Sequence, residues 1–406
     1  MNTPKIRFKG FKDDWEQRKL SEICERITRK NRNNESDLPL TIASQFGLID
    51  QRDFFNKVVA AKDMSNYYLL KKGEFAYNKS YSNGFDYGSI KRLNAYKQGC
   101  LSTLYICFGI TSDEVESDYL ECFFDTLKWY GDLSMICAEG ARNHGLLNVD
   151  TKGFFDEVTV DLPKSLEEQK RISVYMNALN RLITLHQRKC DETKQLKKFM
   201  LQKMFPKNGE KNPEIRFEGF TDDWEQRKFG ELFSRRMERN LGQFDNTRWI
   251  SVARMYFQDP DRVTSNNIDT RTYVMREGDI AFEGHSNQEY RYGRFVANDI
   301  GDGVISELFP IYQHIVPYNN YYWKYAIQIE TIMAPKILRC IEISYTSSNK
   351  LDEKFFLEES TSVPGIEEQR KIGALLSNLD NLITLHQRKC EKLKELKKFM
   401  LQNMFV

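Results

Sequence analysis

Two near-identical copies of one helical sequence constrain the fold of this chain more than any other feature. Residues 182–202 and 382–402 are identical at 17 of 21 positions, at an offset of 200. Each copy closes a longer stretch whose apolar spacing predicts a helix, from about Glu167 to Met204 and from about Glu367 to Phe405. Pro206 cannot continue the first helix, so we expect that helix to stop there.

A second duplication precedes each long helix. Residues 4–19 return as residues 213–228, with 13 of 16 positions identical at an offset of 209. Internal repeats of this kind define the architecture before any single element does. The chain is therefore predicted to be two tandem units, 1–206 and 207–406.

The regions between the repeats, 28–163 and 229–364, diverge almost completely. Short β-like runs dominate both, and Gly, Asn and Asp separate them. A few anchors still align, including Tyr87-Gly88 with Tyr292-Gly293. We interpret this pattern as one scaffold that carries two different surfaces.

The long helices carry a heptad pattern that predicts a two-helix coiled coil within the chain. One stripe of the first helix is formed by Ile172, Leu179, His186, Thr193 and Met200, and the facing stripe, with slips of one residue, by Met176, Ile183, Cys190 and Leu196. The second helix repeats the first stripe with Ile372, Leu379, His386, Leu393 and Met400. The lysines at 197, 198, 397 and 398 are interpreted as a solvated outer face or a partner-binding face. We interpret His186 and His386 as polar seam residues that fix register and not as a metal pair.

Composition bounds the class of protein. The 406 residues are 40% hydrophobic and 13% aromatic, which is typical of a globular chain, and the formal net charge of +2 says little about partners. The eight cysteines form no Cys-x-x-Cys pair, which favours reduced thiols in a cytoplasmic protein. No signal peptide and no membrane-spanning helix are expected, because no apolar run approaches about 18 residues.

The sequence lacks the motifs of several enzyme classes. It contains no Walker A motif, no Asn-Pro-Pro-Tyr-type motif of adenine methyltransferases and no glycine-rich loop placed to hold a methyl donor. The five histidines make neither a His-Glu-x-x-His motif nor a zinc-binding spacing. We therefore predict a chain without catalytic or metal-binding residues that binds no cofactor of its own.

The order of these pieces resembles the specificity (S) subunit of type I restriction-modification enzymes over the whole chain. The resemblance is carried by Leu162-Pro163 followed by Glu167-Glu168-Gln169-Lys170-Arg171-Ile172, and by Val363-Pro364 followed by Glu367-Glu368-Gln369-Arg370-Lys371-Ile372. Trp15 and Trp224, and the endings Met204-Phe205 and Met404-Phe405, fit as well. No single piece is specific, but their order and duplication are.

The resemblance implies an α+β fold of two tandem target recognition domains, each followed by a long helix, with the two helices paired as an antiparallel coiled coil. The implied boundaries are an N-terminal recognition domain at 1–163, a central conserved helix at 164–206, a C-terminal recognition domain at 207–364 and a C-terminal conserved helix at 365–406.

The resemblance also implies a function. Each domain would read one half of a bipartite, asymmetric site in double-stranded DNA. The helices would hold two modification (methyltransferase) subunits for adenine methylation, and restriction subunits would join for translocation and cleavage. S-adenosylmethionine, ATP and Mg would then be bound by the partner subunits. Duplicated scaffolds with different surfaces suit this role, since two identical readers would recognise a palindrome.

Candidate DNA-contacting residues are polar side chains on loops that can reach a groove. In the first domain these are Lys79, Ser80, Tyr81 and Asn83, with Arg142 and Asn143 on a second loop. In the second domain they are His285, Ser286, Asn287, Gln288, Arg291 and Arg294, with Tyr345, Thr346 and Ser347 on a second loop. Gln45 and Arg254 are weaker candidates. The alternative interpretation of each loop is ordinary polar surface, and residues 28–150 are not basic, with 14 Lys and Arg against 16 Asp and Glu.

Two other functions stay open from the residues alone. A coiled-coil scaffold that does not act on DNA would need the same helices. A stand-alone DNA methyltransferase would need the motifs that are missing.

Overall fold

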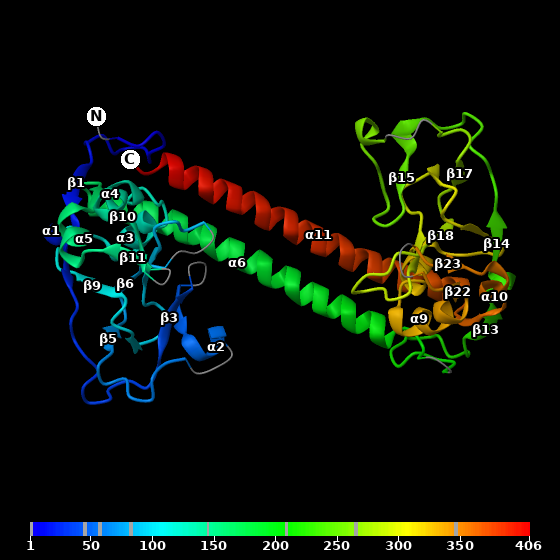
Figure 1. The fold of residues 1–406 in the computed structure, drawn as a ribbon, viewed down its shortest axis with the longest axis horizontal. Helices are drawn as coiled ribbons and strands as arrows, with labels where there is room; N and C mark the ends of the chain where they lie inside the picture. The colour runs from blue at the N-terminus through cyan, green and yellow to red at the C-terminus, as the bar shows by residue number, and fades with distance from the viewer. Residues whose placement is uncertain are drawn as a thin grey trace. The chain divides into compact units, whose positions relative to one another are not determined.

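The structure is a computed structural model that describes residues 3–43, 47–55, 59–80, 84–143, 146–207, 210–263, 267–344 and 348–406; for residues 138–143 and 146 it describes the backbone alone. Its residues form two compact units. Unit 1 comprises Met1–His186 and Lys389–Val406, and unit 2 comprises Gln187–Arg388. Each long helix therefore contributes residues to both units (Figure 1).

Unit 1 begins with strands and short helices, continues into the first part of the first long helix and also includes the end of the second one. In chain order its elements are β1 (Glu16–Lys19), α1 (Leu20–Ile23), β2 (Cys24–Arg26), β3 (Leu40–Ala43), β4 (Gly47–Asp50), α2 (Gln51–Phe55), β5 (Tyr68–Lys71), β6 (Phe75–Asn78), β7 (Ser89–Arg92), β8 (Gln98–Leu101), β9 (Ile106–Ile110), α3 (Ser117–Phe124), α4 (Tyr130–Ile136), β10 (Cys137–Asn143), β11 (Leu146–Val149), α5 (Thr151–Glu157), β12 (Thr159–Leu162) and α6 (Leu166–Lys203). The central sheet has the order β2-β9-β6-β7 and is antiparallel. Two-stranded pairs β1-β12, β3-β4, β5-β8 and β10-β11 surround it.

Unit 2 repeats this plan. Its elements are β13 (Glu225–Lys228), α7 (Phe229–Leu232), β14 (Phe233–Arg236), η1 (Asn246–Arg248), β15 (Ile250–Ser251), β16 (Tyr256–Phe257), η2 (Pro260–Arg262), β17 (Thr272–Met275), β18 (Ile280–Glu283), β19 (Arg294–Ala297), β20 (Gly303–Ser306), β21 (Ile311–His314), α8 (Asn320–Ala326), α9 (Glu330–Arg339), β22 (Ile341–Glu342), β23 (Lys350–Leu351), α10 (Glu353–Glu358), β24 (Ser360–Val363) and α11 (Ile366–Asn403). The order β14-β21-β18-β19 matches the central sheet of unit 1, and β13-β24, β15-β16, β17-β20 and β22-β23 match its pairs. The divergent regions thus share one topology.

Alternation along the central strands explains how this topology survives sequence divergence. Side chains of a strand point to opposite faces in turn. On β6, Phe75 and Tyr77 join the larger core of unit 1 while Ala76 joins the smaller one. On β18, Ile280 and Phe282 face the larger core of unit 2 and Ala281 the smaller one. The apolar pattern is kept although the residues differ.

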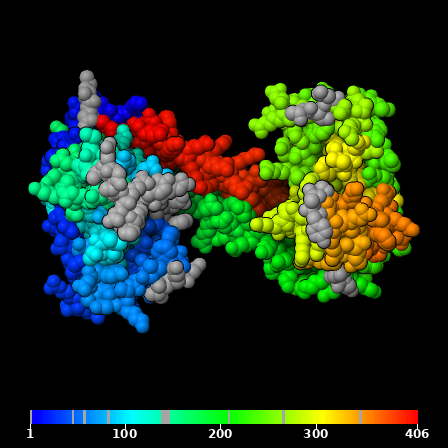
Figure 2. Space-filling view, viewed as in Figure 1, coloured from blue at the N-terminus to red at the C-terminus, as the bar shows by residue number. Residues whose placement is uncertain are grey.

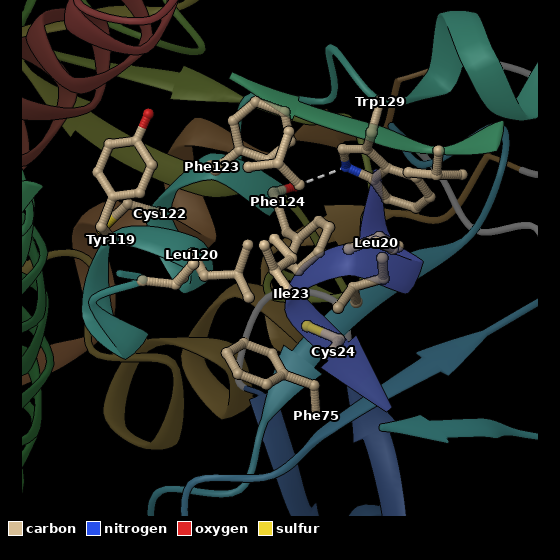
Figure 3. Close-up of a cluster of buried hydrophobic side chains, with 14 of the residues drawn as sticks. Leu20, Ile23, Cys24, Phe75, Tyr119, Leu120, Cys122, Phe123, Phe124 and Trp129 are labelled. Carbon is tan, nitrogen blue, oxygen red and sulfur yellow. Dashed lines mark hydrogen bonds between the residues drawn. The ribbon is translucent and has the colours of Figure 1, made fainter. Parts of the chain in front are cut away.

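Aromatic side chains dominate the larger core of unit 1. Figure 3 shows Phe75, Phe124 and Trp129 packed with residues of α1 and α3. The indole Nε1 of Trp129 donates a hydrogen bond to the carbonyl oxygen of Phe124 at 3.0 Å, so this polar atom is satisfied inside the core.

The long helices pack against each other within each unit, which confirms the predicted α+β class and antiparallel pairing. The thiol of Cys190 lies 4.0 Å from the carbonyl oxygen of Ile383 in unit 2, and the thiol of Cys390 lies 3.9 Å from that of Ile183 in unit 1. Between residues 181 and 200 of α6, the residues that are at least half-buried follow a regular spacing of three and four: Ile183, His186, Cys190, Thr193, Lys197 and Met200. The pattern of α11 is the same at an offset of 200.

The predicted seam was wrong at Leu196, and the predicted outer face of lysines was wrong at Lys197 and Lys397. Leu196 and Leu396 are 44% and 39% exposed, whereas Lys197 and Lys397 occupy the seam. Lysine fits at this position because its aliphatic chain packs between the helices while its ammonium group forms an ion pair with a carboxylate. The Nζ of Lys197 lies 2.6 Å from Asp380 in unit 2, and that of Lys397 lies 3.0 Å from Asp125 in unit 1.

The repeated N-terminal segment and the Glu-Glu-Gln motif bind each other. Arg7 forms a bidentate ion pair with Glu168 at 2.6 and 2.8 Å, and Arg216 does the same with Glu368 at 2.7 and 2.8 Å. The indole of Trp224 also donates to Glu368, at 3.1 Å. The buried carboxylate of each motif is thus paired, as burial of a charge requires.

Each long helix ends in the core of the unit that holds the other repeat. Phe405, at the end of α11, is 2% exposed and stacks on Tyr119 of unit 1, with ring centroids 5.5 Å apart. Phe205, at the end of α6, stacks on Tyr322 of unit 2 at 5.7 Å. Figure 2 shows the C-terminal residues, in red, against the blue and cyan surface of unit 1. Among the described helices, none combines the length and apolarity needed to cross a membrane.

Candidate nucleic-acid interface

The loop that leaves the central sheet has the same length in both units. β6 ends at Asn78 and β7 begins at Ser89, while β18 ends at Glu283 and β19 begins at Arg294, so each loop has ten residues. We call residues 79–88 the unit 1 loop and residues 284–293 the unit 2 loop.

A glycine closes each loop for a steric reason. Gly88 and Gly293 have φ values of 80° and 88°, which residues other than glycine rarely adopt. A Cβ on Gly88 would lie 2.0 Å from the carbonyl oxygen of Asn78, and one on Gly293 would lie 2.6 Å from that of Glu283. The aligned Tyr-Gly pairs therefore hold the loop against the strand it leaves.

The first turn of each loop is built on the last residue of the strand. The backbone N–H of Ser80 donates to Oδ1 of Asn78 at 3.0 Å, and that of His285 donates to Oε1 of Glu283 at 3.0 Å. Ser80 and His285 therefore occupy equivalent positions. The two units present different side chains from one backbone frame.

In both units, a residue that follows the second predicted segment contacts the start of the loop. The N–H of Leu147 donates to the carbonyl oxygen of Lys79, and the N–H of Asn349 donates to that of Gly284, each at 3.0 Å. Gly284 permits this approach, because a Cβ there would lie 2.2 Å from the carbonyl oxygen of Asn349. Residues that adjoin the two predicted segments are therefore in contact in both units.

Within the unit 2 loop, the candidate residues divide by their contacts. His285, Gln288 and Arg291 are exposed. Ser286 accepts a hydrogen bond from the amide of Asn349 at 3.3 Å, and Oδ1 of Asn287 accepts from the N–H groups of Glu289 and Tyr290 at 2.8 and 2.9 Å. Asn287 therefore shapes the turn that carries its neighbours.

The remaining candidates are less completely described. Lys79 and Ser80 are half-buried at the start of the unit 1 loop. Arg142 and Asn143 lie on β10, whose backbone pairs with β11. Tyr81, Asn83, Tyr345, Thr346, Ser347 and Gln45 lie outside the described residues.

A cleft of about 310 Å³ is lined in part by β19, the strand that directly follows the unit 2 loop. Arg254, Arg294 and Lys324 line it together with one carboxylate, Asp299, and with apolar residues that include Val296. Lys324 pairs with Asp299 at 2.6 Å, and the guanidinium of Arg294 donates to the carbonyl oxygen of Ala253. Arg254 is exposed and has no ion-pair partner among the described residues, so the cleft carries an uncompensated positive charge suited to a phosphate oxygen.

Sequence reasoning missed three residues of this region. Glu283 and Asn349 are buried beneath the loops, at 3% and 5% exposure, and Lys324 reaches the cleft from α8. Glu283 could have been predicted from the sequence, because aligning Gly88 with Gly293 also aligns Asn78 with Glu283. Lys324 could not have been predicted, because it is distant in sequence from Arg254 and Arg294. Among the residues whose positions are described, no group of three or more His, Cys, Asp or Glu could hold a metal ion.

This geometry defines a class: a duplicated α+β protein whose two domains present different polar loops from one frame. No family model matches the sequence, and no curated protein matches it. The structure is similar over 100% of this chain and 99% of the other to the type I restriction-modification S subunit from M. genitalium, with a TM-score of 0.60 and 12% identity. The chain therefore has the fold of this S subunit.

Two further solved structures are similar. They are the HsdS subunit from Thermoanaerobacter tengcongensis (TM-score 0.47, 17% identity, 97% of each chain) and a chain from a structure of complex assembly and conformational transition in a type I restriction-modification system (TM-score 0.49, 15% identity, 98% of this chain and 99% of that one). The fold assignment depends on the M. genitalium protein.

Proposed function

We propose that this chain is the DNA sequence-specificity subunit of a type I restriction-modification complex. One observation carries the proposal: the loops of the two units have the same backbone frame but different side chains. They share their length, the closing glycine, the hydrogen bond of the first turn and a backbone hydrogen bond from Leu147 or Asn349 to the first loop residue. A bipartite, asymmetric DNA site needs two readers of this kind, each with its own base preference. The predicted recognition-domain boundaries, 1–163 and 207–364, stay a prediction, as do the base contacts.

The proposal assigns no catalysis to this chain. Two modification subunits supply S-adenosylmethionine and adenine methylation, and restriction subunits supply ATP- and Mg-dependent translocation and cleavage. The chain contributes the site and the placement of its partners on it.

A duplicated apolar surface on the long helices supports binding of two modification subunits. In unit 1 it consists of Leu182, Leu185, Leu396 and Phe399, which are 39–51% exposed. Unit 2 carries the equivalent residues Leu382, Leu385, Leu196 and Phe199 at 44–45% exposure. Exposed apolar side chains at equivalent places favour one equivalent partner per unit. The mass of the co-expressed complex should show two modification subunits per chain, and a limit of one at excess subunit would contradict this arrangement.

Mapping of modified bases tests the function itself. Cells that contain the modification subunits should methylate a bipartite sequence with this chain and none without it. Methylation that is independent of the chain, or absent with all subunits present, would favour the alternative of a coiled-coil scaffold that does not act on DNA.

A further inference from the structure

A buried carboxylate lies under the exposed start of the unit 2 loop. The side chain of Glu283 is 5% exposed, although it sits at the end of β18 where the chain turns toward solvent. A buried carboxylate costs free energy unless charged or polar partners satisfy it. Its partners are the N–H of His285 at 3.0 Å, the Nδ1 of His285 at 2.6 Å and, at 4.0 Å, the Nε of Arg294.

The contact with Nδ1 fixes the imidazole of His285. A carboxylate oxygen accepts hydrogen bonds, so this contact favours the tautomer in which Nδ1 carries the proton and donates to Glu283. Nε2 lies on the other side of a ring that is 66% exposed. The loop thus presents an exposed and oriented ring, which is how recognition side chains are prepared for a ligand.

Unit 1 shows that the turn itself needs no carboxylate. Asn78 makes the equivalent turn by accepting the N–H of Ser80 at 3.0 Å. Glutamate is one methylene longer than asparagine, and in unit 2 the same oxygen accepts both the turn N–H and the ring N–H. What Glu283 adds to the shared frame is the orientation of His285.

We propose that His285 reads one base pair of the DNA half-site bound by unit 2 and that Glu283 is its positioning residue. Nε2 would hydrogen-bond a base edge in the major groove, where each base pair presents a distinct pattern of donors and acceptors. This inference rests on the proposed function.

Three substitutions in the reconstituted complex separate orientation from folding. His285→Ala removes the reading group. Glu283→Asn copies unit 1 and keeps an acceptor for the turn, but it is too short for the ring. Glu283→Gln retains an oxygen that accepts from both N–H groups. The readout is methylation of the mapped wild-type site and of each single-base variant, with thermal unfolding measured in parallel.

We expect His285→Ala and Glu283→Asn to lower discrimination about tenfold at the same single base pair, the scale of one lost base contact. Discrimination should hold elsewhere in that half and throughout the other half, which serves as an internal control for folding. Glu283→Gln should stay within about twofold of the wild type, because a neutral amide oxygen still accepts the Nδ1 proton.

The inference is overturned if folded Glu283→Asn keeps the wild-type preferences, or if it relaxes several base pairs. A wild-type complex that methylates no defined sequence would instead refute the proposed function, so the two failures are distinct.

Discussion

Arg254 is the cation of the unit 2 cleft without an ion-pair partner among the described residues, and it tests the phosphate contact. Arg254→Ala should weaken DNA binding by a similar factor for all sequences. It should also reduce the slope of log K against log salt by about 1, the value for one lost phosphate contact. Titrations of the reconstituted complex at several salt concentrations measure both quantities.

Arg254→Lys is the matched control, since it keeps the charge and should retain most of the salt slope. A change in the methylated sequence with Arg254→Ala would mean that this residue reads bases, and an unchanged slope would mean that the cleft does not bind DNA.

His314, at the end of β21, links the stability of unit 2 to pH. Its ring stacks on Tyr318 with centroids 3.7 Å apart, and neither ring nitrogen has a hydrogen-bond partner among the described residues. Burial lowers the pKa of His314 to about 3. As pH falls below about 6.5, His314 binds a proton in the unfolded chain but not in the folded chain. The free energy of unfolding therefore falls.

His314→Phe keeps an aromatic ring and removes this linkage. The equivalent position of unit 1 is the apolar Ile110, which shows that the frame does not need a histidine. Urea unfolding at pH 7.5 and 5.0 should show the wild type losing about 2 kcal/mol more than the variant. Equal losses would mean that the ring is protonated in the folded chain.

Residue identities could be predicted only in part. DNA contact was predicted for His285 and Gln288 because exposed polar loop residues can reach a groove; the structure shows both side chains exposed, and their contact with DNA stays a prediction. The turn-forming role of Asn287 could not be distinguished from base contact, because an asparagine suits both. Glu283 was missed because its importance depends on burial and on a 2.6 Å contact that no spacing in the sequence reports.

At the scale of elements, the ends of the long helices matter more for stability than their surfaces. Phe405 packs against Trp15, Tyr119 and Phe123 of unit 1. Phe405→Ala should lower the free energy of unfolding of unit 1 by about 3 kcal/mol, as large-to-small changes in a core do. Denaturant unfolding followed by tryptophan fluorescence checks this.

Phe399→Ala, on the same helix, is the matched control. Phe399 is 51% exposed, so its removal should change stability by less than about 0.5 kcal/mol. Equal effects of the two substitutions would mean that the end of α11 is not anchored in the core of unit 1.

The helices were predictable and their seam was not entirely so. Periodicity and duplication located both within one or two residues. The seam was misplaced at Leu196 because leucine is more hydrophobic than the adjacent lysine, which favoured the leucine as the buried residue. The structure shows Lys197 in that place, where Asp380 satisfies its charge.

At the scale of the molecule, the prediction of two units depended on the internal repeats. Two copies of a helix and of the N-terminal segment implied two units, and the structure shows equivalent sheets in both. The sequence could not show that the end of each helix completes the unit of the other repeat. That arrangement depends on contacts such as Phe405 with Tyr119, which join residues far apart in the chain.

The central claim is that the divergent regions carry the DNA specificity and the shared frame does not. Replacing residues 229–364 with the corresponding region of a relative, followed by mapping of modified bases in cells with the modification subunits, tests it most directly. We predict a new sequence in one half of the methylated site and the original sequence in the other half. A change in both halves, or in neither, would contradict the account.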